Sequence, residues 1–287
     1  MPHPPQTPVQ DAVNKSPFLR SLRFLLFRIE CFRLTRVVEI IAHRGASADA
    51  PENTLASIEL AWRQHADAVE VDVQFSKDGE IVVIHDAHTR RTAGFRGKVR
   101  GLTLAQLKKL DAGRWKHPKW AGERIPTLGE ALAIVPPDKR FFIEIKCRAE
   151  ALPQFEKIIT RSPLPPAQIV TIGFDLELMA RIKKGIPALE VCWISQFWRN
   201  WRTGGWRPKP ETLIRKAREA GLDGLDLGRR GPINAKFMAQ ARAANLKVYV
   251  WTVDSPTRAR RLLQAGVDGI TSNRPGWLRE KLSPRGT

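Results

Sequence analysis

The chain has 287 residues and a formal net charge of +19, from 48 Lys or Arg against 29 Asp or Glu. A hydrophobic fraction of 43% excludes a wholly disordered chain, and a chain of this length buries a large core without a disulfide framework. Its three cysteines, Cys31, Cys147 and Cys192, form no Cys-x-x-Cys pair, which argues against a zinc site and for reduced thiols. The positive charge favours anionic partners, whether nucleic acid, a membrane surface or phosphorylated substrates.

Two segments precede the first regular pattern. Residues 1–16, rich in Pro and polar side chains, predict a flexible tail. Residues 17–36 place apolar side chains at helical spacing, but five arginines interrupt them. The longest uncharged run there, residues 24–27, falls far short of the about 20 residues that span a bilayer. This basic apolar helix is expected either to pack against the domain as an extra helix or to lie on a membrane surface.

From residue 37 the sequence alternates between short apolar strands and helical stretches, which is the pattern of an α/β fold. Eight such strands predict a (β/α)8 TIM barrel over residues 37–287. A doubly wound sheet is the alternative, but the chain has no Gly-x-Gly-x-x-Gly turn. A turn at residues 77–79 predicts a hairpin extension of the second strand over 80–84. The predicted strands are 37–42, 68–74, 141–146, 169–172, 189–193, 224–227, 247–253 and 268–271, with helices that include 54–64, 210–220, 234–244 and 255–265.

Two connections in this pattern are long. Residues 87–127 follow the second strand and its hairpin, and residues 195–210 follow the fifth strand. Both are expected to leave the C-terminal end of the barrel, which is the end where such barrels carry their active sites.

Acidic residues stand inside two of the apolar strands. Glu70 and Asp72 are two residues apart, so both side chains point to one face of the sheet, and Glu144 and Lys146 repeat this spacing. Carboxylates among Val and Ile are costly unless they are ion-paired or bind a metal. Three acidic ligands at strand ends suit one hard divalent cation, Mg²⁺ or Ca²⁺. The alternative is a salt-bridge network in which Lys146 and Arg44 neutralise the acids.

Two histidines also stand at strand ends. His43 ends the first strand, and His85 ends the hairpin after the second. Neighbouring imidazoles can act as an acid and base pair near neutral pH. Arg44 is a planar donor suited to phosphate, and Lys146 adds a second cation. A divalent ion, two cations and two imidazoles indicate a site for phosphate-ester chemistry, in which the histidines move the protons.

These residues belong to a set of motifs that resembles the glycerophosphodiester phosphodiesterase family over about residues 37–282. The motifs, in the family's order and at its usual spacings, are His43-Arg44-Gly45, Pro51-Glu52-Asn53-Thr54, Glu70-x-Asp72, His85-Asp86 and Glu144-Ile145-Lys146. The resemblance implies a (β/α)8 barrel that hydrolyses glycerophosphodiesters to glycerol 3-phosphate and an alcohol. It implies 87–127 as the family's insertion, His43 and His85 as acid and base, and metal ligation by Glu70, Asp72 and Glu144.

Further residues are expected to line the pocket, and two motifs depart from the family's pattern. Trp251 matches an aromatic pocket position of the family, with simple core packing as the alternative. Family members commonly carry Thr-Asp-x-Pro after the last strand, where this chain has Thr271-Ser272-Asn273-Arg274-Pro275, and Gly173-Phe174 replaces Ser-Phe. Both changes bear on substrate contacts more than on the reaction. The predicted pocket residues are Glu52, Asn53, Phe174 and Trp251.

Five of the nine tryptophans lie in the two long connections, among basic residues. Trp beside Arg is typical of a membrane interface, with rings at headgroup depth and cations toward anionic lipid. The sequence therefore predicts an enzyme at an anionic membrane surface, with lysophospholipase D-type cleavage of lysophospholipids beside soluble diesters. The alternative is solvated loops whose tryptophans pack onto the barrel. These tryptophans are Trp115, Trp120, Trp198, Trp201 and Trp206.

Other classes of protein explain less of the sequence. Nucleic-acid binding would account for the charge but not for the strand carboxylates, which repel phosphate without a metal, so nucleic acid is not an expected partner. A catalytically inactive barrel would need a broken site, whereas the motif positions are intact. A sphingomyelinase D-type enzyme stays an alternative, although the Glu144 strand and the Pro-Glu-Asn-Thr segment favour glycerophosphodiesters. Without a signal peptide or spanning segment, the expected location is the cytoplasm, with peripheral attachment at the inner membrane surface.

Overall fold

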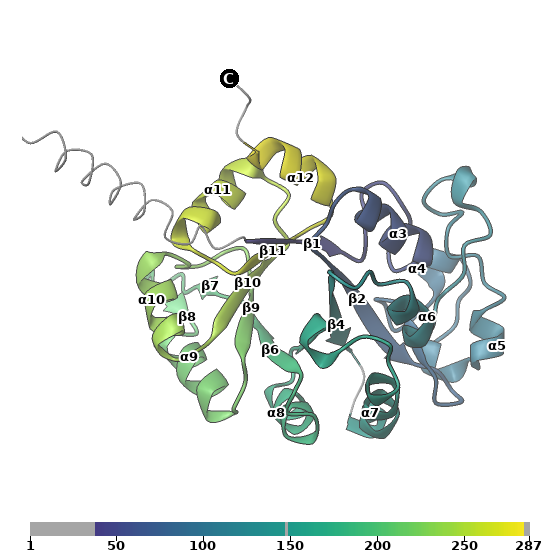
Figure 1. Cartoon of the computed structure of the whole chain (residues 1–287), viewed down its shortest axis with the longest axis horizontal. Helices are drawn as coiled ribbons and strands as arrows, with labels where there is room; N and C mark the ends of the chain where they lie inside the picture. Colours follow the sequence, from purple (N-terminus) through teal and green to yellow (C-terminus); the bar gives the residue numbers. More distant parts are fainter. Residues whose placement is uncertain (1–37, 147–148, 284–287) are drawn as a thin grey trace, which may run out of the picture. The chain divides into compact units, whose positions relative to one another are not determined.

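The structure is a computed structural model that describes residues 38–146 and 149–283. The predicted tail at 1–16 and the predicted helix at 17–36 lie outside the described residues. Eight parallel strands close into a barrel, because the first strand pairs with both the second and the last. Figure 1 shows these strands as a ring with the helices outside it. The predicted (β/α)8 barrel is confirmed.

The barrel strands coincide with the apolar runs of the sequence within one to two residues at each end. The strands follow one another around the barrel in chain order, so a βα connection joins each strand to the next. The strands are β1 (Glu39–His43), β2 (Ala68–Phe75), β4 (Arg140–Ile145), β5 (Ile169–Gly173), β6 (Glu190–Ser195), β9 (Gly224–Gly228), β10 (Lys247–Trp251) and β11 (Gly269–Ser272).

A helix follows each barrel strand and buries one apolar side against it. Capping residues set where several of these helices begin: Thr54 caps the first with a reciprocal Ser57 bond, and Asp175 caps another through two backbone N–H groups. The helices are α3 (Leu55–Arg63), α6 (Leu128–Ala133), α7 (Leu152–Thr160), α8 (Leu176–Gly185), α9 (Pro210–Glu219), α10 (Ala235–Ala243), α11 (Pro256–Ala265) and α12 (Pro275–Leu282). No helix of the described residues is long and apolar enough to cross a bilayer.

The long connection after β2 has its own small core. The hairpin strand β3 (Ile81–Val83) pairs antiparallel with β2, as the turn at 77–79 predicts. Beyond it, α4 (Arg90–Ala93), α5 (Leu104–Leu107) and two single 3₁₀ turns, η1 (Val99–Gly101) and η2 (Pro118–Trp120), surround a cluster that includes Val82, Leu107 and Ile125. The connection after β6 forms a second hairpin, β7 (Trp198–Arg199) with β8 (Trp206–Arg207). Two more 3₁₀ turns, η3 (Ala149–Ala151) and η4 (Pro166–Gln168), flank α7.

Strand register builds the barrel interior in layers, because alternate side chains of each strand face inward. An apolar middle layer contains Ile41, Phe142 and Tyr249. The rings of Phe142 and Tyr249 meet edge to face, with their centroids 5.0 Å apart. At the C-terminal end the same alternation continues into polar residues. His43 stands opposite Glu70 across β1 and β2, and Asp72 opposite Glu144 across β2 and β4. The fold thus gathers the acidic residues of two strands at one end.

Candidate active site

Three carboxylates converge at the C-terminal end of the barrel. Glu70, Asp72 and Glu144 each offer an oxygen atom within 4.8 Å of the others, and all three are buried. They come from adjacent strands in the register just described, so rigid sheet hydrogen bonding fixes their spacing. Oxygen ligands in this number and geometry suit a hard divalent cation.

Two cations contact the same carboxylates. Arg44 Nε lies 3.0 Å from Asp72 Oδ2, and the Lys146 ammonium lies 2.6 Å from Glu144 Oε1 and 3.2 Å from Asp72 Oδ1. This much agrees with the salt-bridge alternative. Glu70 differs, because one oxygen accepts the Arg44 backbone N–H while Oε1 is buried with no hydrogen-bond partner in residues 38–146 and 149–283. The ion pairs therefore leave a buried carboxylate oxygen that a metal ion would satisfy.

The electrostatics of the cluster point the same way. Burial and the charges of Asp72 and Glu144 raise the pKa of Glu70 well above its ordinary value. Burial and Asp72 raise the pKa of Glu144 to about 7. Burial also opposes ionisation of Asp72, but Arg44 and Lys146 outweigh it and hold the pKa of Asp72 below its ordinary value. The protein thus holds more carboxylates together than its own cations neutralise.

The β1–α3 turn is shaped to place Arg44 over these acids. Arg44 and Gly45 both have positive φ, 58° and 78°, and a Cβ on Gly45 would lie 2.5 Å from a backbone carbon of α3. Only glycine fits there. Farther along, Asn53 also has positive φ, and its amide donates to Asp72 Oδ2 at 2.8 Å while accepting the Asp72 backbone N–H. Asn53 therefore fixes the orientation of Asp72, one of the three candidate metal ligands.

His43 has a defined tautomer. Its Nδ1 lies 2.7 Å from Asn273 Oδ1, and the Asn273 amide nitrogen donates to Asp254 Oδ2 at 2.7 Å. Because that amide is oriented by a carboxylate, Asn273 Oδ1 is the acceptor and His43 Nδ1 is the donor. His43 Nε2, 4.0 Å from Glu70 Oε2, is left as an acceptor. Burial and the adjacent Arg44 lower the pKa of His43, which keeps its imidazole neutral near pH 7.

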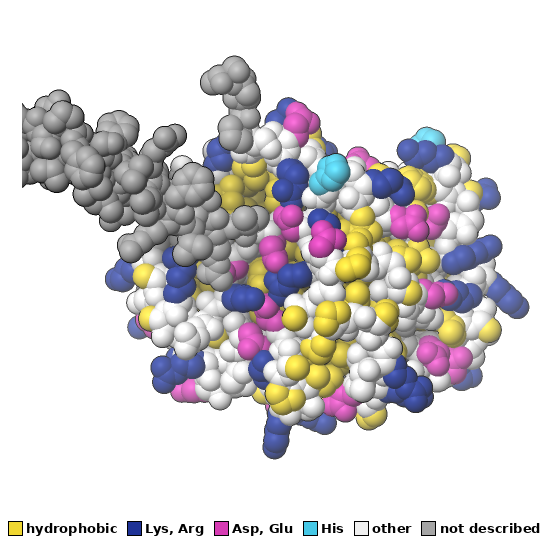
Figure 2. Space-filling model, viewed as in Figure 1, with side chains coloured by type: hydrophobic (Ala, Val, Ile, Leu, Met, Phe, Trp, Pro, Cys, Tyr) yellow, Lys and Arg dark blue, Asp and Glu magenta, His cyan; other side chains and the backbone are white. Residues whose placement is uncertain are grey.

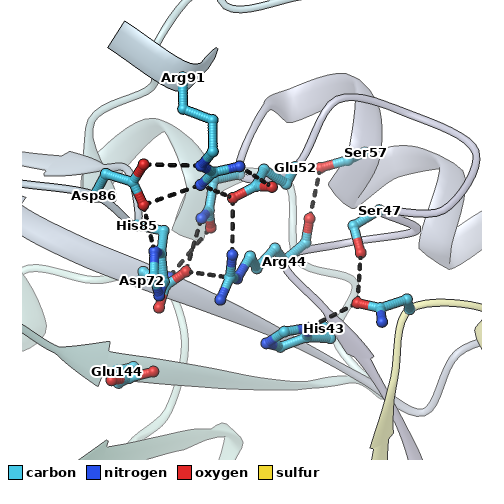
Figure 3. A network of polar contacts seen from close by, with 12 residues as sticks. His43, Arg44, Ser47, Glu52, Ser57, Asp72, His85, Asp86, Arg91 and Glu144 are labelled. Carbon is cyan, nitrogen blue, oxygen red and sulfur yellow. Dashed lines mark hydrogen bonds and ion pairs between the residues drawn. The ribbon is translucent and has the colours of Figure 1, made fainter. Parts of the chain in front are cut away.

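The imidazole of His85 is held by a carboxylate, whereas that of His43 is held by an amide. Its Nδ1 donates to Asp86 Oδ1 at 2.6 Å, and Arg91 bonds both Asp86 and Glu52. Glu52 also accepts from Arg44 at 2.9 Å, which closes a chain of contacts from His85 to Arg44 (Figure 3). Hydrogen bonds from Arg91 hold the pKa of Asp86 at about 2, so this carboxylate is ionised at all working pH values. The ionised Asp86 carboxylate therefore fixes His85 Nδ1 as a hydrogen-bond donor.

A cavity of about 230 Å³ opens over the cluster. Phe174 and Trp251 form part of its wall, and their rings meet edge to face at 6.0 Å. Gly173, which replaces Ser in the family's Ser-Phe pair, makes room for Met179 of α8, because a Cβ there would lie 2.7 Å from the Met179 terminal methyl. The lining comprises His43, Arg44, Glu70, His85, Glu144, Lys146, Ile172, Phe174, Ile194, Asp226, Trp251, Thr252 and Thr271.

The structure brings the predicted site residues together, but two of the predicted pocket residues, Glu52 and Asn53, do not line the cavity. Glu52 and Asn53, expected in the pocket, contact Arg44 and Asp72 on the side away from the lining. Four residues with no predicted role join the site: Asp86, Arg91, Asn273 and Asp226. Asp86 stands in the His85-Asp86 motif, and Asp226 is an acid inside the apolar strand Gly-Leu-Asp-Leu, a signal of the same kind as Glu70. Asn273 and Arg91 lie in loops where no periodicity marks them.

Comparison with known proteins agrees with this architecture. Residues 43–277 match the sequence profile of the Glycerophosphoryl diester phosphodiesterase family. The chain belongs to that family. Among curated proteins, it is 33% identical over 244 residues to a glycerophosphodiester phosphodiesterase of Caldanaerobacter subterraneus, covering 83% of this chain and 95% of the relative. It is 30% identical over 255 residues to a glycerophosphodiester phosphodiesterase of Bacillus subtilis, covering 82% of this chain and 83% of the relative.

A solved structure agrees as well. A phosphodiesterase of Oleispira antarctica, in complex with the product sn-glycerol-3-phosphate, superposes with a TM-score of 0.75 at 27% identity. The match covers 85% of this chain and 96% of that one. As a member of the glycerophosphodiester phosphodiesterase family, the chain is a phosphoric diester hydrolase.

Proposed function

We propose that the chain hydrolyses glycerophosphodiesters to glycerol 3-phosphate and an alcohol, with one divalent metal ion held by Glu70, Asp72 and Glu144. The observation that carries this is the convergence of three buried carboxylates, one with an unpaired oxygen, of which Glu70 and Glu144 line the cavity. Mg²⁺ and Ca²⁺ both accept such oxygen donors. When bound, the ion would offset negative charge that develops on the phosphate.

The protein's own residues supply the remaining parts of the reaction. Arg44 and Lys146 border the cavity with cationic groups that bind the phosphate oxygens. His43, neutral and with Nε2 as an acceptor, takes a proton from the attacking hydroxyl, which belongs either to water or to the substrate's own glycerol. As the new P–O bond forms and the bond to the alcohol breaks, His85 gives its proton to the departing alkoxide. If the attacking hydroxyl is that of glycerol, this step gives a cyclic phosphate, which water then opens to glycerol 3-phosphate: His85 takes the proton of that water, and His43 returns its proton to the departing glycerol oxygen. Asp86 and Asn273 keep the two imidazoles in these opposite roles.

The test is release of sn-glycerol 3-phosphate from glycerophosphocholine, followed with Mg²⁺, with Ca²⁺ and with EDTA. We expect activity that EDTA removes and one metal restores. His43→Ala and His85→Ala should each lose turnover while metal binding, measured by calorimetry, survives. His88→Ala is the matched control, because His88 is exposed and does not line the cavity. Full turnover in either active-site variant would reject the assigned roles.

A second candidate is cleavage of lysophospholipids by the same site, in the manner of a lysophospholipase D. One observation favours it: a groove of about 530 Å³, lined by Phe197, Trp206 and Trp251, adjoins the cavity at Trp251. A groove with aromatic walls beside a phosphodiester site fits a substrate that carries a hydrocarbon chain. A comparison of kcat/KM for lysophosphatidylcholine and glycerophosphocholine decides between the two.

A further inference from the structure

The β7–β8 hairpin presents aromatic side chains to solvent. Trp201, in its turn, is 85% exposed and Trp198 is 58% exposed. Arg202 lies over the Trp201 ring at 4.8 Å. The alternative that these tryptophans pack onto the barrel is therefore wrong for Trp198 and Trp201, although Trp206 is half-buried. A large aromatic side chain gains nothing from such exposure in a freely soluble surface loop, so this placement indicates a partner.

The charged residues of the hairpin and of the loop that lines the groove with it are all basic. Segments 196–209 and 228–234 contain six basic residues and no Asp or Glu. By contrast, basic and acidic side chains are intermingled over the face of the molecule shown in Figure 2. The basic residues are Arg199, Arg202, Arg207, Lys209, Arg229 and Arg230.

The hairpin and the catalytic cavity are joined by the groove. Arg199, Arg229 and Arg230 line this groove together with Trp198 and Phe197, and Trp251 lines both the groove and the cavity. A partner surface that binds the hairpin would therefore lie close to the mouth of the active site.

We propose that this basic aromatic surface, formed by the β7–β8 hairpin and residues 228–230, docks the barrel mouth on an anionic lipid bilayer. The inference rests on the proposed function, because the phosphodiester that the cavity takes is a group that a lipid surface carries. Trp rings prefer the headgroup depth of a bilayer, and guanidinium groups bind lipid phosphates there. Stacking of nucleic-acid bases on the same rings is the competing use of this chemistry.

Co-sedimentation of the full chain with vesicles tests the proposal. Vesicles of phosphatidylcholine with 30 mol% phosphatidylglycerol should bind the protein at about 0.15 M salt, more weakly as salt rises, and pure phosphatidylcholine vesicles should bind at least tenfold less. The double substitution Trp198→Ala and Trp201→Ala should weaken binding at least tenfold, and Trp201→Ala alone, outside the lining of the groove, should leave turnover of glycerophosphocholine unchanged. Trp277→Ala is the matched control, because Trp277 is another exposed tryptophan near an arginine, on α12.

Several outcomes would overturn the proposal without touching the proposed function. These are absence of binding to anionic vesicles, unchanged binding by the double variant, equal loss in the Trp277→Ala control, and tighter binding of a single-stranded oligonucleotide than of vesicles. If the wild-type chain instead failed to turn over glycerophosphocholine with any metal, the proposed function would fall.

A different observation concerns the cavity wall itself. Asp226, on β9, is only 3% exposed, and its Oδ1 is buried without a hydrogen-bond partner in the described part of the chain. Its own backbone oxygen accepts from the Trp251 indole at 3.3 Å, but no ion pair of the described residues involves its carboxyl group. Burial and the charge of Glu144 raise the pKa of Asp226 well above its ordinary value.

We infer that Asp226 binds a hydroxyl group of the substrate's glycerol. This second inference also rests on the proposed function. A buried polar group on a cavity wall costs stability unless the ligand completes its hydrogen bonds, and the glycerol hydroxyls are the uncharged polar groups that such a substrate brings. Asp226 acts here as a substrate-binding residue, because it bonds the glycerol part of the substrate directly.

The test compares two substrates in three proteins. Asp226→Leu should raise KM for glycerophosphocholine at least tenfold, with a smaller change in kcat, and Asp226→Asn should retain most of the affinity. A propyl phosphodiester of choline, which lacks the glycerol hydroxyls, should bind wild type and Asp226→Leu equally well, measured as KM or, where it is not turned over, as its inhibition constant against glycerophosphocholine. Thr171→Val is the control, because Thr171 also has a buried unpartnered oxygen but does not line the cavity. An unchanged KM in Asp226→Leu, while wild type turns over glycerophosphocholine, overturns the inference.

Discussion

The three buried carboxylates make the metal-free protein sensitive to pH in a definite direction. Removal of metal by chelation leaves Glu144 beside Asp72, and burial together with that neighbour raises the pKa of Glu144 from 4.5 to about 7. A carboxyl group with a raised pKa binds its proton more tightly in the folded state than in the unfolded one. Its contribution to stability is therefore complete below pH 4.5 and is lost as the pH rises through about 7.

The size of this effect follows from the pKa values. The interval from 4.5 to about 7, at about 1.4 kcal/mol for each pH unit, corresponds to about 3 kcal/mol of unfolding free energy. This is a large fraction of the roughly 5–15 kcal/mol that stabilises a typical domain. A bound divalent cation favours the ionised carboxylates and should remove most of the pH dependence.

Urea denaturation in EDTA at pH 4.5, 6 and 8 measures the effect, with Glu144→Gln as the comparison. The Gln side chain has nearly the same shape but cannot ionise, so the metal-free variant should match wild type at pH 4.5 and exceed its stability by about 3 kcal/mol at pH 8. Saturating Mg²⁺ should restore the wild type at pH 8 and do little for the variant. The reasoning is refuted if the two metal-free proteins keep the same difference in stability at all three pH values.

Three further changes probe the supports of the site. Asn273→Ala removes the acceptor that fixes the tautomer of His43, and kcat should fall about tenfold to a hundredfold with metal affinity unchanged in calorimetry. Arg91→Met removes the guanidinium group that joins Glu52 to Asp86, and steady-state kinetics should show kcat reduced about tenfold. Gly45→Ala should cost at least about 2 kcal/mol in urea denaturation, since its methyl group would overlap the backbone of α3. Gly79→Ala, at similar φ but in open space, should cost about half as much.

The sequence predicts the barrel well because its strands are buried on both faces. Such strands read as short apolar runs, and the eight runs, from 37–42 to 268–271, correspond to the eight strands observed. Period-2 spacing also predicts that Glu70 and Asp72 share a face of the sheet, and in the structure both side chains meet Glu144 in one buried cluster. These inferences depend only on local geometry, so one sequence is enough for them.

Contacts that join distant segments are beyond such reasoning. The bond between His43 and Asn273 spans 230 positions, and the contact between Arg91 and Glu52 spans 39. No periodicity relates these pairs, since loops at the end of the barrel bring them together. The exposure of Trp201 is of the same kind, because composition predicts a basic aromatic loop but not which rings face solvent.

The charge balance of the site gives an independent reason to expect a divalent cation. Apart from the two histidines, five carboxylates and three cations are linked in the cluster, so these eight groups would carry a net charge of −2 when all of them are ionised. A surplus of this sign would repel a phosphodiester, whereas one divalent ion brings the cluster to neutrality. Arg44 and Lys146, no longer fully used in offsetting carboxylates, are then able to attract the substrate's single negative charge. The five acids are Glu52, Glu70, Asp72, Asp86 and Glu144, and the three cations are Arg44, Arg91 and Lys146.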